Sequence, residues 1–144
     1  MTLDDILEEI KKAETIVILS HESPDGDAVA SSLSVMHAVE QLGKKADVVI
    51  PEYSRDFKFL PGAEKILEKG QEEPYDLAIS VDCTDLKRLA CGNEYFEPAK
   101  RTIEIDHHSV NAMFADYNYV DPVAPACCQV LAAMFEYYNI DINK

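Results

Sequence analysis

The sequence predicts an α/β domain in which a parallel β-sheet carries helices on both faces. Residues 15–19, 46–50 and 77–81 form continuous, largely apolar and β-branched runs, which are typical of strands buried on both sides. Segments with helical periodicity lie between these runs, and strands that alternate with helices favour a parallel sheet. Clusters of aspartate and histidine follow three of the expected strands, where parallel sheets place their ligand sites.

Three helices and two strands are expected in the first half of the chain. Thr2 or Asp4 caps the first helix, which keeps its apolar residues on one face. Gly43 ends the second helix as its C-terminal cap, and Pro51 ends the second strand. In chain order, these elements are a helix ending near residue 13, a strand at 15–19, a helix at 28–42, a strand at 46–50 and a short helix between 61 and 70.

The second half continues the alternation without a repeat or a linker, so we expect one domain. Pro122 and Pro125 precede an apolar stretch that predicts the last helix. In chain order, the elements are a strand at 77–81, a short helical piece at 86–90, a strand at 102–105, an extended segment at 117–120 and a helix at 124–138.

The bulk composition is that of a globular protein, and we expect a cytoplasmic location. The chain has 144 residues, 47% of them hydrophobic, which is enough for a sizeable core. No apolar stretch approaches the roughly 20 residues of a membrane span, and the N-terminus lacks the apolar core of a signal peptide. We therefore expect no membrane partner. The net charge of −14 argues against a long nucleic-acid duplex as ligand, because phosphate binding requires clustered lysine and arginine.

The four cysteines are expected to be reduced and mostly buried. Cys127 and Cys128 are adjacent, and neither Cys83 nor Cys91 belongs to a C-x-x-C pair that could begin a zinc cluster. Reduced thiols of this kind are typical of a reducing compartment.

Three short motifs hold the candidate functional residues, each at the end of an expected strand. They are H-E-S-P-D-G-D at 21–27, V-D-C at 81–83 and D-H-H at 106–108. Carboxylates and imidazoles without cysteine suit a divalent ion such as Mn²⁺ or Mg²⁺. Together the motifs predict a metal-dependent hydrolase.

The first motif lies on a tight turn that enters a helix. His21, Asp25 and Asp27 are its candidate ligands, and carboxylates on either side of Gly26 can point toward two different ions. The alternative is that Ser23 or Asp27 only caps the following helix. Capping and metal binding are compatible, so both interpretations stay open.

The other two motifs have alternatives of their own. Asp82 or Thr84 alone could cap the next helix. The segment 106–108 could be a solvated loop, but an aspartate and two histidines are costly to bury without partners, and a carboxylate can orient a metal-binding imidazole. His37 falls inside a helix and is expected to be structural or to face solvent.

Read together, the segments H-E-S-P-D-G-D-A-V-A-S-S, V-D-C and D-H-H-S-V-N resemble the DHH phosphoesterase superfamily. The likeness covers essentially the whole chain, and the motif spacing is similar to that of bacterial nanoRNases that are also 3′-phosphoadenosine 5′-phosphate (PAP) phosphatases. It implies a Rossmann-like DHH domain in a Mn²⁺-dependent hydrolase, with Mg²⁺ or Co²⁺ as other candidate ions.

The resemblance also implies how the residues bind metal. His21 and Asp25 would bind one ion, Asp27 and His107 would bind the second, and Asp82 would bridge the two. Two ions roughly 3.5–4 Å apart can activate a water and stabilise both the attacking and the leaving oxygen.

Three further residues complete the implied site. His108 would face the scissile phosphate, Asp106 would support the histidines, and Asn111 would brace their loop. The catalytic set is therefore expected to be His108, Asp106 and Asp82.

Three departures from the family pattern affect these expectations. Ala30 replaces a usual glycine, and Ala126-Cys127 stands where relatives offer serine or threonine hydroxyls. The sequence ends at Lys144, before a fourth acidic motif and a basic C-terminal substrate-binding domain. We therefore expect a truncated N-terminal DHH domain with an incomplete second metal site, and self-association as a homodimer.

Several functions stay open on the sequence alone. The leading one is cleavage of short single-stranded oligoribonucleotides or of a nucleotide 3′-phosphate. The alternatives are a fragment that binds metal or nucleotide without turnover, and a relative of family II inorganic pyrophosphatases or cyclic-dinucleotide phosphodiesterases.

Overall fold

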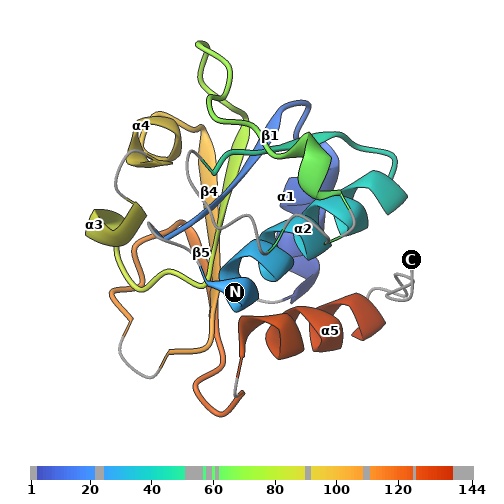
Figure 1. Ribbon diagram of the computed structural model, residues 1–144, viewed down its shortest axis with the longest axis vertical. Helices are drawn as coiled ribbons and strands as arrows, with labels where there is room; N and C mark the ends of the chain where they lie inside the picture. Colours follow the sequence, from blue (N-terminus) through green and yellow to red (C-terminus); the bar gives the residue numbers. More distant parts are fainter. Residues whose placement is uncertain are drawn as a thin grey trace.

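The computed structural model describes residues 3–21, 25–50, 57, 60, 62–89, 92–108, 111–124 and 126–137. Its five strands form one sheet in the order β2-β1-β3-β4-β5, and every neighbouring pair is parallel (Figure 1). The strand bounds are β1 Ile16–Ser20, β2 Ala46–Val48, β3 Leu77–Val81, β4 Arg101–Asp106 and β5 Tyr117–Val120. The predicted α/β class with a parallel sheet is confirmed.

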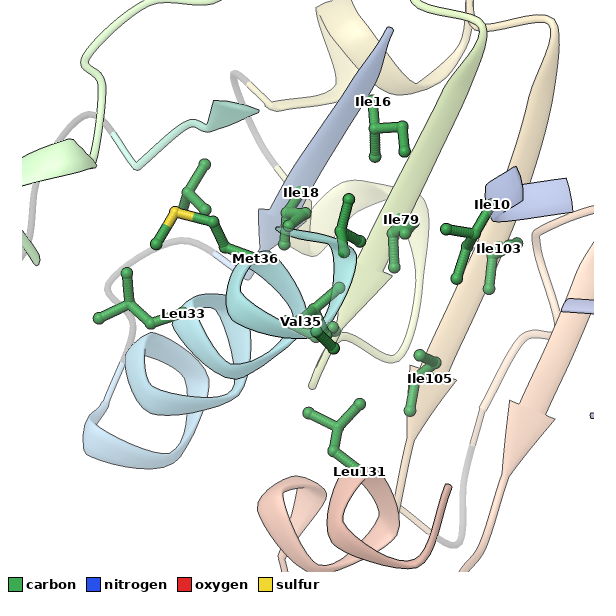
Figure 2. Close-up of a cluster of buried hydrophobic side chains, with 14 of the residues drawn as sticks. Ile10, Ile16, Ile18, Leu33, Val35, Met36, Ile79, Ile103, Ile105 and Leu131 are labelled. Atoms are coloured by element: carbon green, nitrogen blue, oxygen red, sulfur yellow. The ribbon is translucent and has the colours of Figure 1, made fainter. Parts of the chain in front are cut away.

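Helices cover both faces of the sheet, as predicted. One face packs against α1 (Leu3–Lys12), α2 (Gly26–Gln41) and α5 (Cys127–Tyr137), and Figure 2 shows its isoleucines beneath Val35 of α2 and Leu131 of α5. The opposite face packs against the short helices α3 (Leu86–Leu89) and α4 (Asn93–Phe96).

The sequence of β1 shows why both faces are covered. Ile16 and Ile18 enter the core below α2, while Val17 and Leu19 enter the second core with Phe96. All five residues of β1 and all five of β3 are buried, so a continuous apolar run is what two covered faces require.

The strand order determines where a ligand can bind. The chain reverses direction across the sheet between β1 and β3, and the carboxyl ends of strands at such a switch point leave a crevice. His21 follows β1, Asp82 follows β3, and β4 ends at Asp106, directly before His107. All three motifs therefore reach the same edge of the sheet.

The prediction of a helix between 61 and 70 is wrong. Among residues 62–70, which the structure describes, only a 3₁₀ turn forms, η2 (Ala63–Lys65), and Ile66 is already extended. Leu67 then pairs with the outer edge of β2, where its N–H donates to Val48 O (2.8 Å) and its carbonyl accepts from Ile50 N (3.0 Å). Pairing satisfies backbone groups at an otherwise open sheet edge, which outweighs the helical propensity of so short a segment.

The other boundaries shift by a few residues. The helix predicted at 28–42 begins two residues earlier, and the one predicted at 124–138 begins at Cys127 because 121–124 form a turn. Asp4 lies inside α1 rather than capping it, and Thr2 lies outside the described residues. Gly43 has φ +82°, as the predicted cap requires.

Two further expectations can be compared with the structure. Cys83 and Cys127 are buried free thiols, and burial raises the pKa of the Cys83 thiol to about 12. None of the described helices combines the length and apolar composition that crossing a bilayer requires.

Candidate metal centre

Asp82 lies at the middle of the site, on the residue that follows β3. Its backbone has φ +56°, a left-handed conformation that is unusual for a residue other than glycine, and its N–H donates to Ile105 O at 3.0 Å. The side chain is only 3% exposed, and its Oδ1 has no hydrogen-bond partner among the described residues. A buried carboxylate oxygen of this kind is costly unless a proton or a cation is bound to it.

His107 faces this carboxylate from the end of β4. Its Nε2 lies 3.2 Å from Asp82 Oδ1 and 3.7 Å from Asp27 Oδ2, while its Nδ1 lies 3.3 Å from the carbonyl oxygen of Ala124. Because a carbonyl only accepts, Nδ1 donates in this contact, and Nε2 is the ring nitrogen directed at the two carboxylates. An imidazole nitrogen grouped with two carboxylate oxygens is a donor set that suits a divalent cation.

The turn before α2 supplies two carboxylates with different partners. Asp25 is the N-cap, and its Oδ1 accepts from Ala28 N at 2.9 Å. Asp27 lies within the first turn of α2, so the alternative that it caps this helix is wrong, and Ser23 lies outside the described residues. Asp27 instead accepts from the backbone N–H of Cys127, at 3.0 Å.

The described residues contain two groups that could hold a cation, and both include Asp82. The ligand atoms of each group lie within 4.8 Å of one another: His21, Asp25 and Asp82 in one, and Asp82, Asp106, His107 and His108 in the other. The His21 Nε2 atom is 3.6 Å from Asp82 Oδ2, whereas His107 faces Oδ1. Oxygen and imidazole donors on both sides of a buried carboxylate fit a pair of divalent ions.

Asp106 uses both oxygens on neighbouring side chains. Oδ1 is 2.6 Å from His108 Nδ1, and Oδ2 accepts from Asn111 Nδ2 at 2.8 Å. Asn111 in turn accepts from Met113 N, at 2.6 Å. The carboxylate of Asp106 has no exposed surface, and its two contacts orient His108 and the 111–113 segment.

Glu104 lies on the same face of β4 as Asp106. It was not identified from the sequence, because a single acidic residue inside a strand belongs to no motif. It has no exposed surface, and neither carboxylate oxygen has a partner of good hydrogen-bond geometry among the described residues. Burial raises the pKa of Glu104 to about 7, and the charge of Asp106 adds to this effect. The backbone of Phe114 and the side chain of Asn111 come near enough to lower the pKa in part.

The candidate metal ligands and His108 surround a pocket of about 510 Å³, which is large enough for a nucleotide-sized ligand. Thr84, Arg88 and Ala126 also line it, and no motif in the sequence marked the arginine as functional. His37 lies elsewhere on α2, with Nδ1 3.8 Å from Glu40, and does not line the pocket. The lining residues are His21, Asp25, Asp27, Asp82, Thr84, Arg88, His107, His108 and Ala126.

A family model described as "DHH family, N-terminal domain" matches residues 15–144. The chain belongs to the DHH family. The resemblance expected from the three motifs is thereby confirmed.

The chain is also similar to two curated proteins and to one crystal structure. The bifunctional oligoribonuclease and PAP phosphatase NrnA of Thermus thermophilus is 30% identical over 139 residues, which cover 94% of this chain and 41% of that protein. A probable manganese-dependent inorganic pyrophosphatase of Streptococcus thermophilus is 29% identical over 140 residues, covering 90% and 43%. The structure of an exopolyphosphatase-related protein from Bacteroides fragilis superposes with a TM-score of 0.85 at 28% identity, covering 94% and 43%.

Both curated relatives are phosphatases by name, which agrees with the predicted metal-dependent hydrolase. The chain spans about two fifths of the length of each of them.

Proposed function

We propose that this DHH-family chain carries the two-metal centre of a Mn²⁺-dependent phosphoesterase. Its substrates would be short single-stranded oligoribonucleotides or nucleotide 3′-phosphates. The observation that carries the proposal is Asp82, which is buried, shared by two ligand groups and left with one oxygen unpartnered among the described residues. The substrate class is supported by the name of the Thermus thermophilus relative, an oligoribonuclease and PAP phosphatase.

The contacts support the following ligand set. His21 and Asp25 would hold one ion together with Asp82. His107 and Asp27, with Nε2 and Oδ2 3.7 Å apart, would hold the other, again together with Asp82. When bound, the two ions would lower the pKa of a shared water and stabilise charge on the phosphate oxygens. The oxygen-rich donor set suits Mn²⁺ or Mg²⁺, and the manganese-dependent relative supports Mn²⁺.

Asp106 and His108 have the remaining roles, which are to orient the proton donor and to transfer the proton. Asp106 accepts from Nδ1 of His108 and thereby fixes the ring, so the other nitrogen, Nε2, is the atom that can exchange a proton with the substrate. In the proposed reaction, protonated His108 gives its Nε2 proton to the leaving oxygen. With 44% of its side chain exposed, His108 can reach a substrate in the pocket, whereas Asp106 cannot.

We further propose that residues 1–144 correspond to the N-terminal DHH domain of a longer phosphoesterase that works as a homodimer in the cytoplasm. The share of the relatives' length that the chain covers supports the first part.

The test is a Mn²⁺-dependent hydrolysis panel with PAP, a short oligoribonucleotide, a cyclic dinucleotide and inorganic pyrophosphate. We expect Asp82→Asn to abolish release of phosphate or mononucleotide, since it removes the charge shared by both ions. Asp47→Asn is the matched control, because Asp47 lies on β2 and accepts from Tyr75 instead of lining the pocket.

The outcomes separate the candidate functions. Unchanged turnover in Asp82→Asn would contradict the proposed centre. Preference for pyrophosphate would instead favour a pyrophosphatase. Manganese binding without turnover on any substrate would favour a binding module.

A further inference from the structure

Arg88 occupies a defined position close to Asp82 in the chain. Its backbone N–H donates to Asp85 Oδ1 at 3.1 Å, so Asp85 caps the short helix α3 that carries the arginine. Leu89, the next residue, is 2% exposed and packs into the core on that face of the sheet. Because α3 is held at both its capped start and its buried end, the base of the Arg88 side chain is fixed relative to the metal centre.

The side chain of Arg88 is exposed and lines the pocket. The other described lining residues are carboxylates, imidazoles, Thr84 and Ala126, so Arg88 supplies the only lysine or arginine among them. Its guanidinium forms no ion pair with any carboxylate of the described residues, although three aspartates line the same pocket. The positive charge of Arg88 is therefore available to an anionic ligand in this pocket.

Burial distinguishes Arg88 from the residues that would hold the ions. The scissile phosphate must reach the ions held by Asp82, which is 3% exposed, whereas Arg88 is an exposed residue of the same pocket. The charges of Asp25, Asp27 and Asp82 offset most of the charge of two divalent ions. A substrate with a second phosphate then needs a further cation, and a guanidinium can bind phosphate oxygens with two parallel hydrogen bonds.

We propose that Arg88 binds a second, uncleaved phosphate group of the substrate and so selects substrates that carry two phosphates. This inference rests on the proposed phosphoesterase function and adds a specificity-determining residue to it. For PAP, the group bound would be the 5′-phosphate while the 3′-phosphate is hydrolysed.

The test compares PAP with adenosine 3′-phosphate, which has the same scissile bond but no 5′-phosphate. We expect Arg88→Gln to raise KM for PAP about tenfold with kcat nearly unchanged, and to leave adenosine 3′-phosphate unaffected. Lys87→Gln is the matched control, because Lys87 is exposed on the same helix, carries the same charge and does not line the pocket. Thermal unfolding of each variant verifies that α3 is intact.

Two results would overturn the inference. If Arg88→Gln lowers kcat/KM equally on both substrates, Arg88 acts on the scissile phosphate or stabilises the fold. If kcat/KM is unchanged on both, Arg88 does not take part in substrate recognition. If wild-type protein hydrolyses neither compound, the proposed cleavage of nucleotide 3′-phosphates fails, and the same variants are titrated calorimetrically with both compounds in Mn²⁺. Tighter binding of PAP that disappears only in Arg88→Gln would still support the inference, whereas equal binding by all variants would overturn it.

Discussion

His107 and His108 are neighbours in sequence and have ring centroids 4.4 Å apart, yet their surroundings differ. His107 faces the carboxylates of Asp82 and Asp27, whereas His108 is fixed by Asp106 and is more exposed. Adjacent imidazoles in such different settings are suited to different tasks, metal binding for the first and proton transfer for the second.

Paired substitutions of the two histidines test this division. We expect His108→Gln to lower kcat about 100- to 10,000-fold, the usual contribution of a positioned proton donor, while Mn²⁺ affinity changes little. We expect His107→Gln to weaken Mn²⁺ binding about 10- to 100-fold. Calorimetric titration with Mn²⁺ and steady-state kinetics at saturating Mn²⁺ separate the two effects, and equal metal affinities in both variants would contradict the division.

At the scale of elements, the N-terminus of α2 is joined to the site and to a distant helix. Asp25 caps α2 with Oδ1, and Asp27 in the same turn accepts from the first residue of α5, 100 positions further along the chain. The helix start is therefore held by the same carboxylates that are proposed to bind metal. Capping was predicted for Ser23 or Asp27, whereas the structure places the cap at Asp25, a residue predicted only as a metal ligand.

The two roles of Asp25 can be separated by a pair of variants. Asparagine is as good an N-cap as aspartate, so Asp25→Asn should leave the free energy of unfolding nearly unchanged while it weakens Mn²⁺ binding. Asp25→Ala should also lower the free energy of unfolding, by about 1 kcal/mol. Denaturant unfolding in EDTA and Mn²⁺ titration provide the two measurements. Equal loss of stability in both variants would show that the carboxylate is needed for more than capping.

At the scale of the whole molecule, the sheet buries a carboxyl group at its centre. Glu104 lies opposite Ser80 of β3 in the strand register, and neither side chain has a hydrogen-bond partner among the described residues. Because burial raises the pKa of Glu104 from 4.5 to about 7, the folded chain binds more protons at this group than the unfolded chain between those values. The contribution of Glu104 to stability therefore falls as pH rises from about 4.5 to about 7, and is constant above that range.

Glu104→Gln should remove this pH dependence. We expect the variant to match the wild type near pH 4.5 and to exceed it above pH 7, by about 3 kcal/mol in free energy of unfolding. Urea unfolding across this pH range in EDTA measures the difference, and Glu64→Gln, at an exposed position on η2, controls for the loss of one acidic residue. Parallel curves for wild type and Glu104→Gln would contradict a buried, ionisable Glu104.

Local patterns predicted most of the sheet. Leu77–Val81 matches its predicted bounds because a run buried on two faces is visible without knowledge of its neighbours, and the half-buried edge strand Tyr117–Val120 matches its bounds as well. The prediction for the segment near Leu67 is wrong, because its extended conformation depends on pairing with the free edge of β2 and local sequence does not indicate that pairing. Helix α4 was missed because its four residues, Asn93–Phe96, are too few to show periodicity.

The sequence by itself determined the family, the strands and the convergence of the three motifs, because parallel strands end at one edge of a sheet whatever their order. Only the tertiary structure decided which groups meet there. Strand order, register and backbone turns decide three features of the site. They are the contacts of His21 and His107 with opposite oxygens of Asp82, the buried position of Glu104, and the presence of Arg88 in the lining of the pocket. These are set by contacts between residues far apart in the chain, which local composition and periodicity do not record.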